Sequence, residues 1–328
     1  MSPFRKLLRR AICAPAFTSL TTLGLLLLLF GCGSLLFSGF FSLQVVFNLL
    51  IDNAWLLVMA LGMTFVILSG GIDLSAGSVL ALTTMLCGFL LQTWHWPALA
   101  VIAAVLCAGG LFGASMGVLI HYFKLQPFIV TLAGMFLARG LCYLISINSI
   151  TITDPFFTLM SQSQITLFDA FISPSVLIAA FALITAIALA HFTPFGRIMY
   201  AIGGNESSAL MMGLPVGPVK ICIYAVSGFC AALGGVLFSF YMLSGYALHA
   251  QSSELDAIAA VVIGGTLLSG GYGYVAGTVT GVLVLGTIQT MIAFDGTLSS
   301  WWTKIVIGAL LLAFCLVQRI LSKNHSSN

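Results

Sequence analysis

Long apolar segments with almost no charged residues constrain the fold of this chain more than any other feature. Runs such as residues 20–36 and 279–293 are continuous and approach the roughly 20 residues that a membrane-crossing helix needs. Only 6% of the residues are charged, whereas soluble domains carry roughly 25%. In lipid, only helices or a closed β-barrel satisfy the backbone, and barrel strands would alternate apolar and polar residues. The sequence therefore predicts an all-α polytopic membrane protein.

The apolar pattern predicts about ten spans of roughly 20 residues each. They cover residues 17–38, 46–68, 73–92, 97–120, 127–147, 172–192, 221–243, 255–270, 272–294 and 301–319. If the chain starts in the cytoplasm, nine of the eleven basic residues lie on the cytoplasmic side, as the positive-inside rule requires. The two exceptions are Arg139 and Lys304. We therefore expect both termini to be cytoplasmic.

The spans divide the chain into three parts. Residues 1–16 form a basic cytoplasmic N-terminus, residues 17–320 the transmembrane domain and residues 321–328 a cytoplasmic tail. The basic start resembles that of a signal peptide, but the apolar run after it is long and lacks a clear cleavage site, so we expect an uncleaved anchor. Two loops are long: residues 148–171, expected outside, and residues 193–220, expected in the cytoplasm.

Small residues form regular patterns within the apolar runs. Gly109, Gly113 and Gly117 repeat every four residues, as do Gly273, Gly277 and Gly281, which is typical of close helix packing. The tetrapeptide LSGG occurs at residues 68–71 and again at 268–271, a weak sign of an internal repeat.

The motifs of common catalytic sites are missing from the sequence. No lysine follows a glycine, so there is no Walker A phosphate loop, and neither HExxH nor GxSxG occurs. The cysteines form no CxxC pair and the histidines are scattered. We therefore expect no enzyme activity, no bound metal and no bound cofactor in this chain.

Ionisable residues in or near the membrane are the main functional lead, because a charge at the bilayer centre costs roughly 2.5–3.5 kcal/mol or more. As candidates for a substrate pathway we select Asn53, Asp73, Ser75, Ser78, Arg139, Glu254 and Asp256. Asp73 has two interpretations, a cap at the start of a helix or a direct role in transport. Glu254 and Asp256 also open a span, where carboxylates complement the helix dipole.

The cytoplasmic loop contains the segment NESSALMMGLPV, residues 205–216, which has the pattern of a short amphipathic helix. Asn205 or Ser207 can cap it, Glu206 lies in its first turn, and Gly213 with Pro215 ends it. Its two methionines, at positions 211 and 212, suit docking into a groove of another protein. A plain connecting helix is the alternative.

Four stretches of the sequence resemble the permease subunits of ABC importers for monosaccharides, in the ribose-type branch. They are GMTFVILSGGIDLSAGSVLAL (62–82), PFIVTLAGMFLARG (127–140), FGRIMYAIGGNESSALMMGLPV (195–216) and LDAIAAVVIGGTLLSGG (255–271). The C-terminal stretch at residues 294–312 is most similar to permeases of galactofuranose-type importers, which pair two related permease chains.

The resemblance implies a type II-like permease of about ten helices that transports by alternating access and binds no cofactor. A separate cytoplasmic ATPase subunit, which uses ATP and Mg²⁺, would dock on the loop at residues 193–220. The coupling residues would be Gly203, Asn205, Glu206, Ala209 and Gly213. The chain departs from many relatives in having serines at positions 207 and 208.

The resemblance also implies the surroundings of the chain. We expect a bacterial inner membrane and its lipid, a periplasmic sugar-binding protein, a second permease chain in a heterodimer rather than a homodimer, and no nucleic acid. Two other functions stay open. An ion-coupled secondary transporter would use Asp73 or Glu254 as its cation or proton site. A membrane-embedded enzyme would need a catalytic cluster that the sequence does not supply.

Overall fold

The computed structural model describes residues 15–167, 170–297, 299 and 301–326. The predicted N-terminal segment 1–16 lies almost wholly outside the described residues, as do the last two residues of the predicted tail. The ten main helices are α2 (Pro15–Leu36), α3 (Leu43–Leu68), α4 (Ala76–Gln92), α5 (Ala98–Tyr122), α6 (Pro127–Ile145), α8 (Pro174–Phe192), α11 (Val216–Met242), α12 (Ser253–Ile263), α13 (Val275–Asp295) and α14 (Trp301–Ser326).

The helices confirm the predicted all-α membrane fold. Six of them, α3, α5, α6, α8, α11 and α13, are long and apolar enough to cross a membrane. Three shorter apolar stretches, Thr21–Leu36, Ala76–Gln92 and Trp301–Leu316, lie in α2, α4 and α14. Proline at the first helical position starts α6 and α8, where the missing N–H costs nothing. These nine helices lie at nine of the ten predicted spans.

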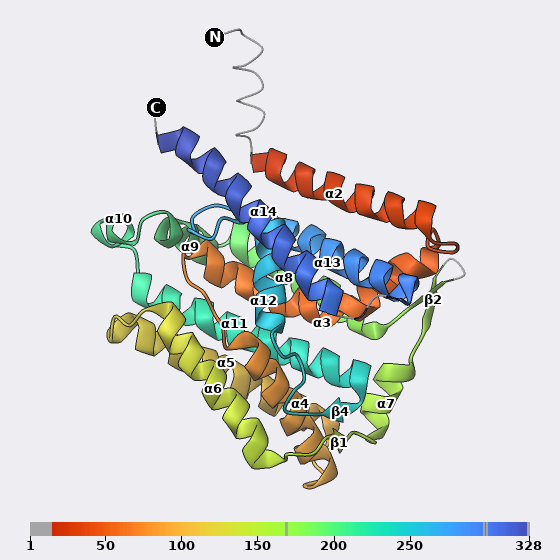
Figure 1. Ribbon diagram of the computed structural model, residues 1–328. Helices are drawn as coiled ribbons and strands as arrows, with labels where there is room; N and C mark the ends of the chain where they lie inside the picture. The colour runs from red at the N-terminus through yellow and green to blue at the C-terminus, as the bar shows by residue number, and fades with distance from the viewer. Residues whose placement is uncertain (1–14, 168–169, 298, 300, 327–328) are drawn as a thin grey trace.

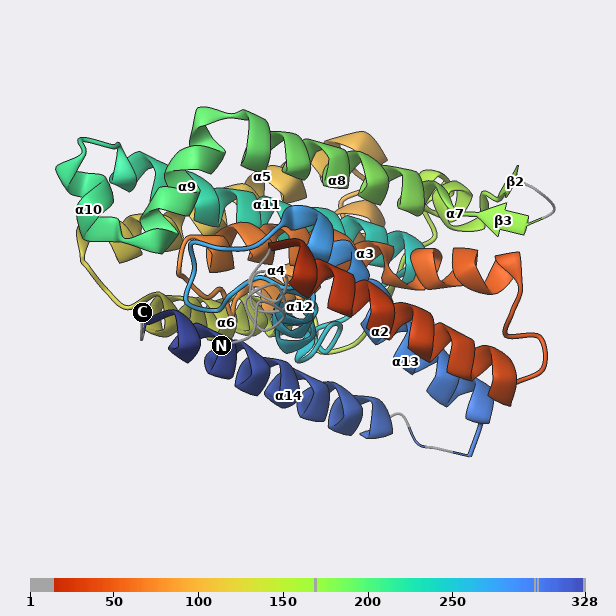
Figure 2. The ribbon, with the colours of Figure 1, turned by 90° about the horizontal axis from the view of Figure 1, so that it is seen from above.

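The eighth predicted span, residues 255–270, is wrong as a span. Its helix α12 has 11 residues, which at 1.5 Å per residue is about 16 Å, roughly half the thickness of the hydrocarbon core. Figure 1 shows α12 lying across the direction of α3 and α13, and Figure 2 shows it nearly end-on. Residues 259–263 of α12 are completely buried. The apolar run therefore reflects burial inside the protein rather than exposure to lipid.

The remaining elements lie at opposite ends of the helix bundle (Figures 1 and 2). Helices α9 (Pro194–Gly204) and α10 (Glu206–Met211) lie at one end, toward which α14 runs. Helix α7 (Pro155–Gln162) and two small antiparallel sheets lie toward the other end. In these sheets β1 (Ile150–Thr151) pairs with β4 (Ser244–Gly245), and β2 (Ile165–Leu167) pairs with β3 (Ala170–Ile172).

Close packing through glycine holds the bundle together, as the repeated spacing predicts. A methyl group added at Gly109, Gly113 or Gly117 would overlap the backbone or side chains of α11, so these residues let α5 approach α11 closely. Gly277 and Gly281 do the same for α13 against the end of α12. Gly273 differs, because it lies before α13 in a backbone conformation with φ of +153°.

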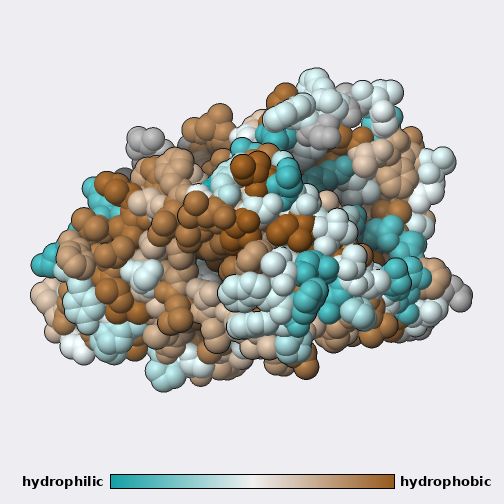
Figure 3. Space-filling model, turned by 90° about the horizontal axis from the view of Figure 1, so that it is seen from below, coloured by the Kyte–Doolittle hydropathy of each residue, from teal (hydrophilic) through white to brown (hydrophobic). Residues whose placement is uncertain are grey.

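The outer surface of the bundle is apolar. Large side chains of α6 and α8, such as Phe136, Leu144 and Phe181, are exposed. Seen from below (Figure 3), hydrophobic side chains cover the middle and left of the molecule, and hydrophilic ones gather mainly toward the right, the end of α7 and the small sheets. An exposed apolar surface of this extent is typical of contact with lipid.

Candidate functional site

The loop between α8 and α11 forms a projection made of two short helices, α9 and α10. The hydroxyl oxygen of Thr193 accepts a hydrogen bond from the amide of Gly196 at 3.3 Å and caps α9. The side-chain oxygen of Asn205 accepts one from the amide of Ser208 at 2.9 Å and caps α10. Gly213 has a φ of +74°, which suits glycine, and it ends α10 as the sequence predicts.

One face of α10 is exposed, and the opposite face packs against the rest of the protein. Ala209 is completely buried, whereas Leu210, Met211 and Met212 have exposed side chains. Glu206 accepts hydrogen bonds from the ammonium group of Lys220 on α11 at 2.8 Å to both carboxylate oxygens. This ion pair ties the start of α10 to α11 and leaves the methionines facing outward.

The two LSGG segments meet at the base of this projection. The amide of Gly271 donates a hydrogen bond to the carbonyl oxygen of Leu68 at 2.9 Å. Gly70, Gly270 and Gly271 have φ of +81°, +82° and +73°, a region in which an L side chain is strained. A methyl group on Gly270 would lie 2.6 Å from the amide nitrogen of Gly70. The sequence repeat therefore marks a contact between two chain segments 200 residues apart.

Gly203 of α9 packs into this contact from the projection. A methyl group on Gly203 would overlap both the carbonyl oxygen of Leu68 and the amide nitrogen of Gly271. We call residues 68–71, 203–204 and 269–271 the glycine junction. It joins α9, the end of α3 and the loop between α12 and α13 through backbone atoms, so a displacement of one segment must move the other two.

A tyrosine adds a second link beside the glycine junction. The hydroxyl of Tyr200 on α9 donates a hydrogen bond to the carbonyl oxygen of Gly273 at 2.8 Å. Burial, together with the neighbouring Tyr274, raises the pKa of Tyr200 to about 12. The hydroxyl therefore stays protonated at physiological pH and remains a donor.

Asp73 is a buried connector between α4 and α11. Its side chain accepts hydrogen bonds from the amide of Ser75 at 2.9 Å, from the hydroxyl of Ser75 at 2.6 Å and from the hydroxyl of Ser227 on α11 at 2.7 Å. Asp73 and Ser75 are each 2% exposed. These three hydrogen bonds hold the Asp73 side chain between Ser75 and Ser227 of α11.

Arg139 binds the segment that leads into α12. Its guanidinium donates hydrogen bonds to the carbonyl oxygens of Ala247 and His249, the latter at 3.0 Å. This contact accounts for the basic residue inside a predicted span, because Arg139 satisfies backbone groups of a non-helical segment that enters the bundle.

Of the remaining pathway candidates, Glu254 lies against the start of α4, where a methyl group added at Gly77 would overlap its carboxylate, and it is near Arg139 and Asp256. Asp256 pairs with Lys304 of α14, with 2.5 Å between the carboxylate oxygen and the ammonium nitrogen. Glu254 and Ser78 each have a buried side-chain oxygen without a hydrogen-bond partner among the described residues. The amide of Asn53 donates to the carbonyl oxygen of Leu49 at 2.9 Å.

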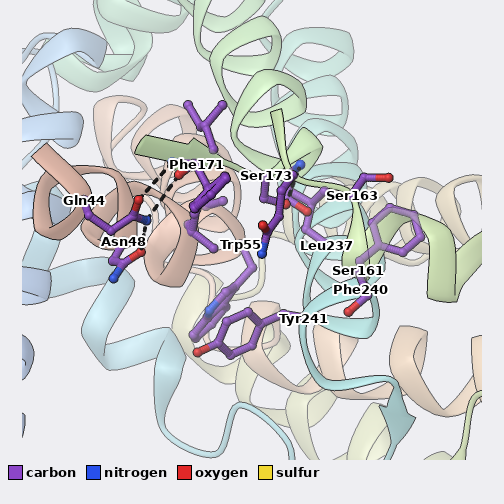
Figure 4. A pocket seen from close by; sticks show the side chains of 15 residues that line it. Gln44, Asn48, Trp55, Ser161, Ser163, Phe171, Ser173, Leu237, Phe240 and Tyr241 are labelled. Atoms are coloured by element: carbon purple, nitrogen blue, oxygen red, sulfur yellow. Dashed lines mark hydrogen bonds between the residues drawn. The ribbon is translucent and has the colours of Figure 1, made fainter. Parts of the chain in front are cut away.

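Among the cavities in the described part of the chain, two can hold a small molecule. A groove of about 600 Å³ between α12 and α14 is lined by Gln251, Asp256, Trp301 and Lys304 among others. A cavity of about 290 Å³ lies between α3, α11, the end of α7 and the start of α8 (Figure 4). Of the seven pathway candidates, Asp256 lines the groove and none lines the cavity.

The residues around the 290 Å³ cavity are not among the site residues predicted from the sequence. Gln44 and Asn48 lie four positions apart in the first part of α3, so they share a face of this mostly apolar helix. This polar pair, followed by Asp52, is a signal that could have marked the site. The cavity also draws on Tyr241 and Ser173, which lie far from α3 in the sequence.

Comparison with known proteins shows a family match over most of the chain. The family described as branched-chain amino acid transport system / permease component matches residues 45–315. The inner membrane ABC transporter permease protein YjfF of Escherichia coli K12 is 49% identical, over 89% of this chain and 89% of its own. The fructose import permease protein FruG of Bifidobacterium longum is 39% identical, over 88% and 86% of the two chains.

A third relative covers a similar part of the chain. The ribose import permease protein RbsC of Bacillus subtilis is 39% identical, over 84% of this chain and 84% of its own. No solved structure shows a significant match.

Proposed function

The chain belongs to the family of transport-system permease components, and we propose that it is the membrane-spanning subunit of an ATP-driven importer of a monosaccharide. As a permease component it is a multi-pass inner-membrane protein, is not an enzyme and carries no cofactor of its own. ATP and Mg²⁺ belong to the ATPase subunit that such a permease requires.

The projection of α9 and α10 is the observation that carries this proposal. It combines an outward-facing apolar surface at Met211 and Met212 with a rigid connection to the bundle through the glycine junction. An ATPase that binds this surface and changes shape would push α9 against the end of α3. The coupling residues in this proposal are Gly203, Asn205, Glu206, Ala209 and Gly213.

The direction of insertion follows from the same projection. Because the ATPase is cytoplasmic, the end of the bundle that carries α9 and α10 faces the cytoplasm. Helix α14 ends on that side and α2 runs away from it (Figures 1 and 2), which supports cytoplasmic termini. The end that carries α7 and the small sheets then faces the periplasm, where a sugar-binding protein would deliver the substrate.

The class of substrate is proposed from the relatives. Two of the three relatives described above are named as permeases for fructose and for ribose, which favours a monosaccharide. Galactofuranose is the finer hypothesis, and it rests on the likeness of residues 294–312. The same likeness favours a second, related permease chain over a homodimer.

The substrate pathway is proposed along the groove between α12 and α14. Asp256 and Lys304 bring a carboxylate and an ammonium group to its wall, and Glu254 lies two residues before Asp256. Both groups can hydrogen bond to sugar hydroxyls. The other five candidates do not line the groove, so in this proposal they position the helices that form it. They are Asn53, Asp73, Ser75, Ser78 and Arg139.

Uptake by the reconstituted importer tests the proposal. Proteoliposomes should contain the permease chains and the ATPase, with the binding protein and a radiolabelled sugar added. We expect uptake to need ATP and to stop when the Walker A lysine of the ATPase is replaced. Uptake that persists in this variant and follows a proton or sodium gradient would refute the proposal and favour the ion-coupled transporter.

A further inference from the structure

We propose that the 290 Å³ cavity at the periplasmic end is a second saccharide site, one that holds a single neutral monosaccharide on the permease itself. It lies outside the groove of α12 and α14 and at the opposite end of the bundle from α9 and α10. The inference rests on the proposed function and adds a place where the permease receives the sugar.

The chemistry of the lining matches a polyhydroxylated ring. Gln44, Asn48 and Gln164 supply side-chain amides, and serines of α7 and of the α8 start supply hydroxyls. Trp55 and Tyr241 add aromatic side chains. Amides and hydroxyls can both donate and accept hydrogen bonds, as sugar hydroxyls do. Aromatic rings offer an apolar face to the C–H groups of a sugar.

The lining also argues against a charged substrate. None of the fifteen lining side chains carries a formal charge at neutral pH. An amino acid would bring both a carboxylate and an ammonium group, and burying either without a partner is costly. Although the family description names branched-chain amino acids, this cavity suits a neutral ligand.

Several of the polar groups are already held in position. The amide of Phe171 on β3 donates to the side-chain oxygen of Gln44 at 2.9 Å, and the side-chain nitrogen of Gln44 donates to the side-chain oxygen of Asn48 at 2.7 Å (Figure 4). With its oxygen engaged, Asn48 makes no hydrogen bond from its side-chain nitrogen to any described residue. This donor is therefore oriented and free for a ligand.

The two aromatic side chains named above, Trp55 and Tyr241, are also held in position by their neighbours. Trp55 packs edge-on against Phe238, with ring centroids 4.9 Å apart. Its indole N–H makes no hydrogen bond within the described part of the chain. The hydroxyl of Tyr241 donates to Asp52 at 3.2 Å. Asn48 and Trp55, each with a side-chain donor that no described residue accepts, thus both line this cavity.

The size of the cavity limits the ligand. Sites for small molecules commonly measure roughly 300–1,000 Å³, so a volume of about 290 Å³ corresponds to one sugar ring and excludes an oligosaccharide. The cavity is partly open, because Asn48 and Tyr241 are exposed. A sugar can therefore enter it from the periplasmic side.

Equilibrium binding to the whole importer complex tests this site. The complex of permease chains and ATPase, in lipid nanodiscs and without the binding protein, should be titrated separately with radiolabelled D-ribose, D-fructose, D-xylose, D-galactose and L-leucine. We expect at least one sugar to bind and L-leucine not to bind. Asn48→Ala and Trp55→Phe should each weaken sugar binding about tenfold, the effect of one lost hydrogen bond.

Matched variants at the same end of the bundle serve as controls. Asn148→Ala and Trp94→Phe change exposed residues outside the cavity and should bind sugar like the unmodified chain. Trp55→Phe keeps an aromatic ring against Phe238, which preserves the fold. Equal binding by all four variants, or no binding of any of the sugars, would overturn the proposal.

Two further results separate this inference from the proposed function. If the unmodified importer takes up no sugar with ATP and the binding protein, the proposed function fails. If uptake is normal but Asn48→Ala and Trp55→Phe weaken only the attachment of the binding protein, the cavity receives a segment of that protein, and the saccharide site is refuted.

Discussion

Replacing Gly203 by alanine should uncouple ATP hydrolysis from transport, because Gly203 lies at the centre of the glycine junction. The added methyl group would overlap the carbonyl oxygen of Leu68 and the amide nitrogen of Gly271. Both are backbone atoms, so no side-chain rotation can relieve the overlap.

The size of the effect follows from this geometry. Overpacking of a closely packed site costs about 1–3 kcal/mol. Weakening the hydrogen bond from Gly271 to Leu68, now 2.9 Å long, adds about 1 kcal/mol. A total of about 2–4 kcal/mol would shift an equilibrium between conformations with and without this contact by roughly 30- to 700-fold.

The neighbouring glycine offers a matched control. Gly204 is in the same helix, and a methyl group added there would meet nothing within 4 Å. Gly204 belongs to the glycine junction through its backbone, but a methyl group added to it enters open space, so the two substitutions differ in whether the added methyl group overlaps the junction. We expect Gly204→Ala to transport normally.

The assay compares sugar uptake with ATP hydrolysis in proteoliposomes. In Gly203→Ala the ATPase should still assemble, since the exposed face of α10 is unchanged, and ATP hydrolysis should continue while uptake falls at least tenfold. Thermal unfolding of both variants in detergent measures any loss of stability. The reasoning is refuted if Gly203→Ala takes up as much sugar for each ATP as Gly204→Ala.

Three other substitutions test single contacts of the candidate site. Glu206→Lys places a positive charge opposite Lys220. Because an exposed ion pair contributes only about 0–1 kcal/mol, the permease should still insert, but ATPase assembly, measured by co-purification, should fall. Unchanged assembly would contradict the assignment of Glu206 as a coupling residue. Asp73→Asn replaces one of the two accepting carboxylate oxygens, so the hydrogen bond from Ser227 or those from Ser75 are lost. The yield of folded protein should therefore drop. A normal yield with lost uptake would instead indicate that Asp73 has a role in the substrate pathway. Gly213→Ala forces a side chain into a φ of +74° at a cost of about 1 kcal/mol. This strain at the C-terminal end of α10 should weaken ATPase assembly several-fold in the same co-purification. Full assembly would show that ATPase binding does not depend on how α10 ends.

The short helix α12 shows where the hydrophobic pattern misleads. Residues 255–270 are apolar enough for a span, but Gly264 and Gly265 end the helix at Ile263. Apolar residues are required both against lipid and in the interior of a protein, so composition alone cannot distinguish them. Only packing against α3, α4, α13 and α14 decides that α12 is buried.

The projection of α9 and α10 was more predictable. Its caps at Asn205 and Gly213 depend on neighbouring residues and on local backbone conformation. The partner of Glu206 is 14 residues away on α11, and no local pattern identifies it. A helix end can therefore be recognised from the sequence, whereas the contact that anchors it cannot.

By itself, the sequence determined the membrane class, nine of the ten spans, the caps of α10 and the family, since each depends on local composition or on a continuous motif. The tertiary structure alone decided that the two LSGG segments meet around Gly203, that Asp73 binds Ser227, and that Gln44, Trp55 and Tyr241 line one cavity. These contacts join residues far apart in the chain, and they depend on how the helices pack, which hydrophobic periodicity leaves open.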